Sequence, residues 1–205
     1  MKITDLLIID ENTKKYIINW DMVSSIPQFK KLKHTPQNPL WHYEGTVWTH
    51  TLFVTNLMFS KIDNNINNKN DLLLLMAALF HDIGKGETTI FNESKNSWSS
   101  PKHAEVGSEM IKDILNEEND ENINIIKFYV ANHMKVLFLI EHTDVCEELQ
   151  KLNSTISKKD DDYIEKLIFL KECDCCGSVM CKHDNWKEIL TILQKYNNTR
   201  KILYL

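Results

Sequence analysis

The chain has 205 residues, which is enough for one well-buried domain, and a formal net charge of −5 at pH 7. The negative charge argues against a protein that coats duplex DNA by charge alone, and a small anionic ligand is the expected partner. No signal-peptide cleavage pattern opens the chain, and no apolar segment approaches the ~20 residues that a bilayer crossing needs. We therefore expect one soluble, cytoplasmic domain over residues 1–205, without membrane contact.

The first 45 residues show no clear chemical signal. Apolar residues are sparse over residues 1–19, where at most a short helix is predicted, and residues 1–35 are expected to cover the domain core. Three prolines and a glycine between Pro27 and Gly45 predict an irregular surface segment. Lysines at 30, 31 and 33, with others at 102 and 135, suit an entrance for anions, although lysines usually belong to the solvated face.

A helix is predicted after Thr46, which is a suitable N-cap. On this helix His50, Val54 and Met58 recur at intervals of four residues, so His50 faces the core. A single histidine on an apolar stripe is most often a satisfied core residue, and this interpretation is favoured for His50 alone.

The most informative stretch is LLLLMAALFHDIGK, residues 72–85. It begins as an apolar run without a polar face, which predicts a helix buried on all sides, with Asn70 or Asp71 as its cap and Gly84 as its stop. The run ends in His81 and Asp82. Such polar groups persist in an interior only when they are paired, hydrogen-bonded or bound to a metal.

Two further helices are predicted to direct a histidine inward. The segment from Gly86 to Ser99 is polar and broken, and Ser100 with Pro101 is a typical helix start. On the helix that follows, His103 shares a face with apolar residues. His133 does the same at the end of the next helix, three residues after Val130.

The C-terminal third is predicted to hold two more helices. Ser157 opens the first, where Asp174 lies on an apolar stripe and therefore needs a cation; the second spans about 183–205. Around Asp174, four cysteines crowd with a histidine, in a spacing without the separated pairs of a typical zinc site. We favour reduced thiols, with a structural zinc as the alternative, at Cys173, Cys175, Cys176, Cys181 and His183.

Taken together, the inward polar residues form a set from five predicted helices, and independent coincidence explains them poorly. The set comprises His50, His81, Asp82, His103, His133 and Asp174. Four imidazoles and two carboxylates without thiolate suit Mn, Fe, Co, Ni or Mg, and six ligands are enough for two divalent ions bridged by Asp82. Two such ions, ~3.5 to 4 Å apart, activate a water and neutralise charge on a phosphate.

The order of these residues resembles the HD-domain superfamily of metal-dependent phosphohydrolases, named for a histidine followed by an aspartate. The wording QNPLWHYEGTVWTHTL, AALFHDIGK and KHAEVGSEMI is most similar to HD domains joined to bacterial tRNA nucleotidyltransferases and to their free-standing relatives. The resemblance covers about residues 36–174. It implies an all-α helical bundle around a metal pocket and hydrolysis of a phosphate ester, often of a nucleotide. Asp174 is the weakest match to the family's final ligand position, and the aspartates at 160–162 are alternative candidates for it.

Residues around the ligands also have predicted roles, Lys85 from the resemblance and the others from their position next to the ligand helices. Lys85 matches a lysine that reaches the phosphate or leaving group, although a lysine here also suits a helix C-terminus. His42 and Glu44 are expected at the pocket mouth as a general acid or substrate contacts, with a structural hydrogen bond as the alternative. Lys102 is a further candidate for substrate binding.

We therefore predict a metal-dependent phosphatase or phosphodiesterase that acts on a nucleotide or an RNA terminal phosphate. Cyclic dinucleotide cleavage is not favoured, because no GYP signature follows HDIGK. The alternatives are a diiron oxygenase of the same superfamily and a non-catalytic nucleotide-binding regulator.

Overall fold

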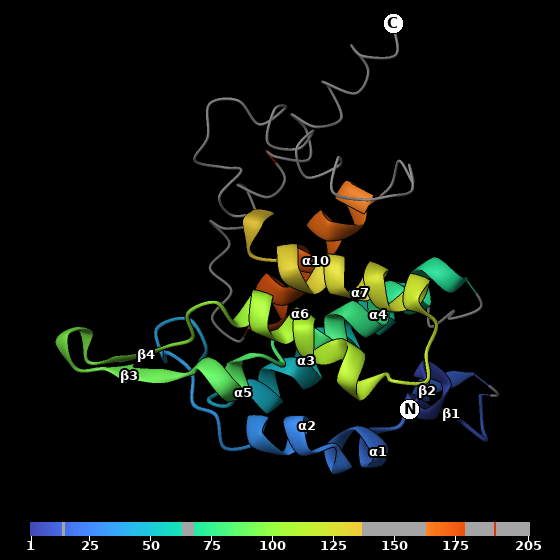
Figure 1. Ribbon diagram of the computed structural model, residues 1–205, viewed down its shortest axis with the longest axis horizontal. Helices are drawn as coiled ribbons and strands as arrows, with labels where there is room; N and C mark the ends of the chain where they lie inside the picture. Colours follow the sequence, from blue (N-terminus) through green and yellow to red (C-terminus); the bar gives the residue numbers. More distant parts are fainter. Residues whose placement is uncertain (14, 63–67, 137–162, 179–190, 192–205) are drawn as a thin grey trace, which may run out of the picture.

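The computed structural model describes residues 1–13, 15–62, 68–136, 163–178 and 191. Helices form the body of this part, and two short antiparallel hairpins lie at its edges (Figure 1). The predicted all-α class is therefore confirmed. Within the described residues, no helix combines the length and apolar character needed to cross a bilayer.

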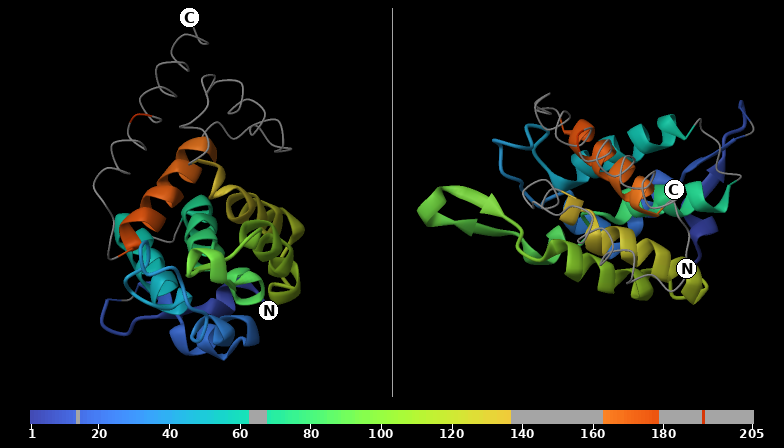
Figure 2. Two further views of the ribbon diagram at one scale, coloured as in Figure 1. Left: turned by 90° about the vertical axis from the view of Figure 1, so that its left-hand side faces the viewer. Right: turned by 90° about the horizontal axis from the view of Figure 1, so that it is seen from above.

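Helix α4 (Lys69–Phe80) is the centre of the bundle, as its sequence predicts. Every residue from Leu73 to Phe80 is buried, because α4 packs against α3 (Val47–Lys61), α7 (Asp120–Asn132) and α10 (Tyr163–Gly177). The left view of Figure 2 shows α4 enclosed by these neighbours. Helix α6 (His103–Ile114) packs on α7 and completes the bundle.

The helix caps agree with the sequence in one place and differ in two. Thr46 caps α3, since its hydroxyl accepts a hydrogen bond from the Thr49 amide. Helix α4 begins two or three residues earlier than expected, with Asn68 as its cap. Helix α6 is capped by Lys102 in a left-handed conformation (φ +57°), and Ser100 instead offers its backbone oxygen to His103.

The N-terminal region contains more regular structure than the sequence predicts. A 3-10 turn η1 (Ile3–Leu6) leads into the hairpin of β1 (Leu7–Ile9) and β2 (Tyr16–Ile18), in which Leu7 lies opposite Ile18. Helices α1 (Trp20–Ser25) and α2 (Pro27–Leu32) follow.

The expected irregular segment is therefore partly wrong, because α2 is a helix. Pro27 occupies its first turn, where the fixed φ of proline suits a helix and its missing N–H group would have no helical partner. Phe29 and Leu32 are buried.

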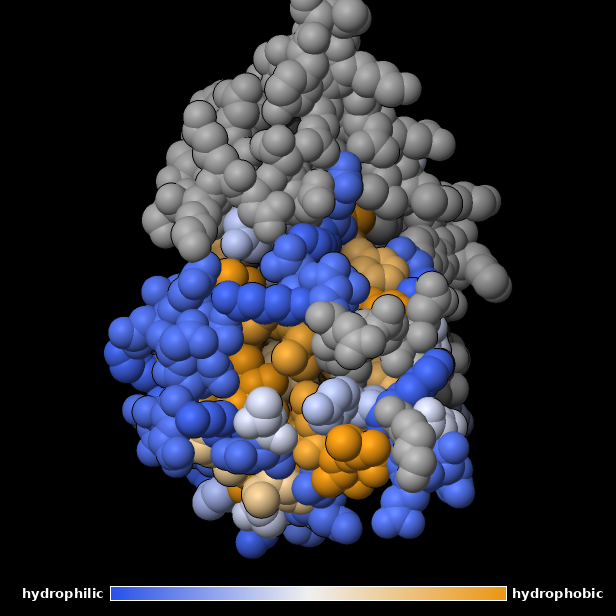
Figure 3. Space-filling model, turned by 90° about the vertical axis from the view of Figure 1, so that its right-hand side faces the viewer, coloured by the Kyte–Doolittle hydropathy of each residue, from blue (hydrophilic) through white to orange (hydrophobic). Residues whose placement is uncertain are grey.

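On the face of the molecule drawn in Figure 3, apolar surface lies in the middle and polar residues lie around it.

The segment after Asp82 is also ordered, contrary to the expected broken loop. It forms the short helix α5 (Lys85–Thr88) and a hairpin of β3 (Ile90–Asn92) and β4 (Ser97–Ser99) around the turn η2 (Glu93–Lys95). The rings of Phe91 and Trp98 meet edge to face across this hairpin, which projects from the body (Figure 1).

Gly84 is needed for close packing and is not the left-handed helix stop that the sequence suggests. Its φ is −68°, and a Cβ placed on it would lie 2.1 Å from the His103 backbone oxygen and 2.5 Å from the Gly107 amide nitrogen. Any larger residue would push α6 away from the turn that carries Asp82. Of the other predictions, the helix start at Ser157 and the helix over 183–205 lie outside the described residues, residue 191 excepted.

Candidate metal centre

The structure brings the six predicted ligand residues together at the centre of the bundle. His50 lies on α3, His81 and Asp82 directly follow α4, His103 opens α6, and His133 directly follows α7; the sixth, Asp174, lies on α10. All are buried except His103, which is partly buried. The burial explains why each appears on an apolar stripe in the sequence.

Three of the histidines share one orientation. The Nδ1 atoms of His81, His103 and His133 lie 2.7–2.8 Å from the backbone oxygen of the residue three positions earlier. A carbonyl oxygen only accepts, so each Nδ1 carries a proton, and each ring in its neutral form presents a lone pair at Nε2. All three Nε2 atoms therefore face the centre as acceptors.

These acceptors surround the carboxylate of Asp82. Its Oδ1 lies 3.3 Å from His103 Nε2 and 3.9 Å from His133 Nε2, and its Oδ2 lies 3.2 Å from His81 Nε2 and 3.8 Å from His50 Nε2. Two groups with metal-binding spacing thus share Asp82: one with His50 and His81, the other with His103 and His133.

Asp174 closes the side of His50 and His81. Its Oδ1 lies 2.9 Å from His50 Nε2 and 3.7 Å from His81 Nε2. The other oxygen lies 2.6 Å from the ammonium of Lys171, so one oxygen faces the histidines and the other is held from outside.

The donor set fits a cation. His81 Nε2 is fully buried without a hydrogen bond, and the Nε2 lone pairs of His103 and His133 face each other at 3.3 Å. Lone pairs and carboxylate oxygens packed in this way repel each other unless a proton or a positive ion lies between them. Imidazole nitrogens and carboxylate oxygens are ligands of divalent transition metals.

Electrostatics keep most of this set ready to bind. Burial lowers the pKa of His133 to about 3 and also lowers the pKa of His103, so both rings are neutral near pH 7. Burial alone would raise the pKa of Asp82, but its neighbours His81 and Lys85 hold it well below the usual range. His50 differs: its bonds to Asp174 and Glu44 outweigh burial and raise its pKa to about 8.

Lys85 lies beside this cluster at its more open side. Its Nζ is 2.7 Å from Asp82 Oδ2 and 3.0 Å from Gln37 Oε1, and its side chain retains 12% exposure. Gln37 was not predicted from the sequence. It lies in the segment before α3, where no periodic pattern marks the inward residues.

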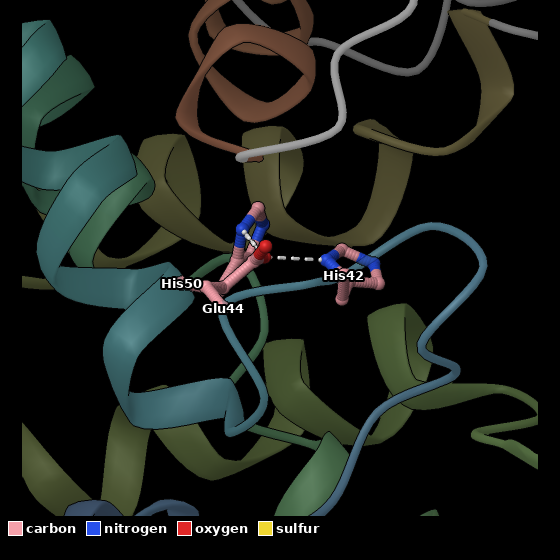
Figure 4. A group of neighbouring side chains, drawn as sticks. All are labelled: His42, Glu44 and His50. Carbon is pink, nitrogen blue, oxygen red and sulfur yellow. Dashed lines mark hydrogen bonds and ion pairs between the residues drawn. The ribbon is translucent and has the colours of Figure 1, made fainter.

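His42 and Glu44 reach the cluster from the segment before α3 (Figure 4). The Glu44 Oε1 atom lies 2.8 Å from His42 Nδ1 and 2.9 Å from His50 Nδ1, and the rings of His42 and His50 are 4.6 Å apart. The two histidines thus share one carboxylate, which keeps its pKa below the usual range although burial opposes this. Glu44 is directed at His50, and His42 retains 20% side-chain exposure beside it.

Lys171 is the charged residue that sequence reasoning missed. It is 5% exposed, and its Nζ also lies 3.9 Å from Met134 Sδ. The signal was its position three residues before Asp174, which places both side chains on one face of α10.

Two other groups of predicted residues stand apart. Lys102 has an exposed side chain and caps α6, although its neighbour His103 belongs to the cluster. In the cysteine group, Cys173 is buried on α10, where burial raises its pKa to about 12 and so favours the thiol. Cys175 and Cys176 are partly buried, and Cys181 and His183 lie outside the described residues, so the zinc alternative stays a prediction.

Known proteins resemble this chain over the same elements. A family model described as HD domain matches residues 47–176. The bifunctional uridylyltransferase/uridylyl-removing enzyme of Vibrio cholerae is 21% identical over 195 residues, covering 88% of this chain and 21% of that protein. The enzyme of the same name from Vibrio vulnificus is 24% identical over 132 residues, covering 63% of this chain and 14% of that protein. The chain spans about a fifth or less of these relatives.

Proposed function

The chain belongs to the HD domain family of metal-dependent phosphohydrolases, and on this premise we propose that it hydrolyses a phosphate ester of a nucleotide or an RNA end. The observation that carries the proposal is the sharing of the Asp82 carboxylate by two pairs of histidines, of which only His103 is partly exposed. A bridging carboxylate between two groups of nitrogen ligands suits a pair of divalent ions.

We assign the six clustered residues to two ions, Mn, Fe, Co, Ni or Mg. His50, His81 and Asp174 would hold one, His103 and His133 the other, and Asp82 both. Bound there, the ions would supply an activated water and neutralise charge on the phosphate oxygens. Asp174 contributes through Oδ1, since Lys171 holds its other oxygen.

Lys85 is placed to contact the substrate phosphate. Its ammonium lies against Asp82 and keeps 12% side-chain exposure, so an incoming phosphate oxygen could replace the side-chain oxygen of Gln37 as its second contact. Glu44 orients His50 through Nδ1, and His42 lies beside the substrate path. We do not retain Lys102 as a direct substrate contact, because its side chain is exposed and its backbone caps α6.

A nucleotidyl ester is the favoured substrate class. The relatives' names include a uridylyl-removing activity, and a uridylyl group is a nucleotidyl group. The present chain corresponds to a small part of those proteins, so their names do not identify the molecule to which the nucleotidyl group is attached. The experiment below therefore compares several nucleotides and nucleotide esters as substrates.

The test is metal analysis of the purified protein followed by a panel of nucleotides and nucleotide esters with added Mn or Mg. We expect bound divalent metal and phosphate or nucleotide release that chelation abolishes. Asp82→Asn should remove this activity by a factor of about 10³ or more, since it deletes the shared charge while keeping the volume. The matched control is Asp113→Asn on the exposed face of α6.

Other outcomes would redirect the proposal. Tightly bound iron with oxygen uptake and no ester hydrolysis would support the diiron oxygenase. Nucleotide binding without turnover in the metal-loaded protein would support a regulator.

A further inference from the structure

Residues 38–45 place aromatic side chains at the edge of the candidate metal centre. Leu40, Trp41 and Tyr43 are 71%, 56% and 72% exposed, whereas His42 and Glu44, which alternate with them, turn inward to the His50 bonds. Single exposed apolar residues are ordinary, but three within four positions concentrate exposed apolar surface on one short segment and make it a candidate contact for a ligand.

This segment is fixed in place by several bonds. Glu44 ties it to His50 on α3, and the hydroxyl of Ser178, just after α10, donates to the Trp41 backbone oxygen. Within the segment, the amides of Trp41 and His42 both donate to the Asn38 oxygen, at 3.1 and 2.9 Å. The aromatic side chains are thus presented on a braced backbone, which lowers the entropy lost when a ligand stacks on them.

We propose that Trp41 and Tyr43 form a stacking site for the base of the substrate nucleotide. This inference rests on the proposed function, because it assumes that the phosphate binds beside Lys85 and Asp82. His42 lies between the two aromatic residues in sequence, and its ring is 4.6 Å from that of His50. The segment that carries Trp41 and Tyr43 therefore runs along the edge of the candidate metal centre.

The features of the patch favour a base over a protein surface. It consists of two aromatic side chains and a leucine, far less than the area of a stable protein interface. Flat aromatic side chains stack on any base, since every base has a π-face, and no charged side chain among residues 40–43 would select a base edge. We therefore expect stacking with little discrimination between purines and pyrimidines.

The experiment measures the affinity of the metal-loaded protein for UMP, AMP and ribose 5-phosphate. The affinity is obtained from the amplitude of the tryptophan fluorescence change after stopped-flow mixing, before any turnover. UMP and AMP should bind more tightly than ribose 5-phosphate. Trp41→Ala and Tyr43→Ala should each weaken nucleotide binding by about 5- to 100-fold and leave ribose 5-phosphate unchanged. Intrinsic fluorescence serves the Tyr43 variants, and competition with a fluorescent nucleotide serves the Trp41 variants.

The conservative variants Trp41→Phe and Tyr43→Phe should retain most of the affinity, because they keep the ring. Phe91→Ala, which removes an exposed aromatic residue from the projecting hairpin, should change nothing. The proposal would be overturned if the parent bound UMP and ribose 5-phosphate equally tightly. It would also be overturned if Trp41→Ala changed the affinity for the two ligands by the same factor, or changed neither affinity.

The two proposals fail separately. Nucleotides that bind through Trp41 and Tyr43 without turnover would contradict the hydrolase and keep the stacking site. If the protein hydrolyses the ester, and Trp41→Ala and Tyr43→Ala both keep the parental KM, the proposed hydrolase activity stands and the proposed stacking site is wrong.

Discussion

The two aspartates of the cluster are each paired with a lysine three residues away, but the two lysines have different surroundings. Lys85 lies 2.7 Å from Asp82 and keeps 12% exposure beside the polar side chain of Gln37. Lys171 lies 2.6 Å from Asp174, its side chain is 6% exposed, and its Nζ also lies 3.9 Å from the thioether sulfur of Met134.

The difference indicates two uses of one charge pair. A lysine with access to solvent can exchange its contacts for those of an incoming anion. A sealed lysine cannot reach a ligand, and its charge instead offsets the desolvation of the aspartate in the folded protein. We therefore expect loss of Lys85 to affect catalysis and loss of Lys171 to affect stability.

The largest effect that separates the pairs is expected for Lys171→Met in the metal-free protein. Removing one partner of a buried pair leaves the other charge uncompensated, at a cost of about 3–5 kcal/mol. The free energy of unfolding, measured by urea denaturation with a chelator present, should fall by this amount. Divalent metal should restore part of it, because an ion next to Asp174 Oδ1 replaces the lost charge.

Lys112→Met is the matched control, since Lys112 makes an exposed pair with Asp120 on the surface and should change stability by less than about 1 kcal/mol. A metal-free Lys171→Met protein as stable as the parent would show that this pair does not offset the desolvation of Asp174.

Lys85→Met should mainly lower turnover. If the ammonium contacts the phosphate in the transition state, its loss costs about 2–4 kcal/mol, which is roughly 30- to 1000-fold in kcat. Metal content, measured on the same preparation, should match the parent. Lys127→Met, which removes a surface partner of Glu109, is the control. Unchanged turnover with both metals present would leave Lys85 as a structural partner of Asp82.

The sequence located the six clustered residues because helical periodicity places each on a buried apolar stripe. The same logic failed for Lys171, since a lysine on a helix is ordinarily solvated and only its spacing from Asp174 marks it. The two hairpins were missed because three-residue strands show too little alternation to detect. Gly84 was assigned to a helix end, whereas its role depends on α6, a neighbour that no local pattern reveals.

Gly84→Ala tests whether the close packing of Gly84 against α6 holds Asp82 and Lys85 at their positions next to His103. The added Cβ would meet backbone atoms of α6, so α6 must move, at a cost of about 1–3 kcal/mol. We expect lower stability in urea denaturation and a lower metal content. Gly86→Ala is the control: its Cβ would meet the flexible Leu32 side chain at 3.3 Å, so metal content should stay unchanged. Parental stability and metal content in Gly84→Ala would contradict the packing role.

The smallest effect concerns His50, which contacts Asp174 and lies 3.8 Å from Asp82. Its raised pKa, about 8, means that the ring carries a proton at pH 7 when no metal is bound, whereas a ligand nitrogen must be free of it. Metal binding at pH 7 should therefore release about one proton from His50, and the apparent affinity should fall about tenfold per unit as pH decreases below 8. The pKa of His133, about 3, keeps that ring neutral over this range, and burial also lowers the pKa of His103 from its ordinary value. Titration calorimetry in buffers of different ionisation enthalpy measures the proton release directly.

Glu44→Gln removes one of the two carboxylates that stabilise the protonated His50 ring, so this variant should release fewer protons on metal binding at pH 7. Equal metal affinity of the parent protein at pH 6.5 and pH 8 would show that His50 binds no proton in the metal-free site.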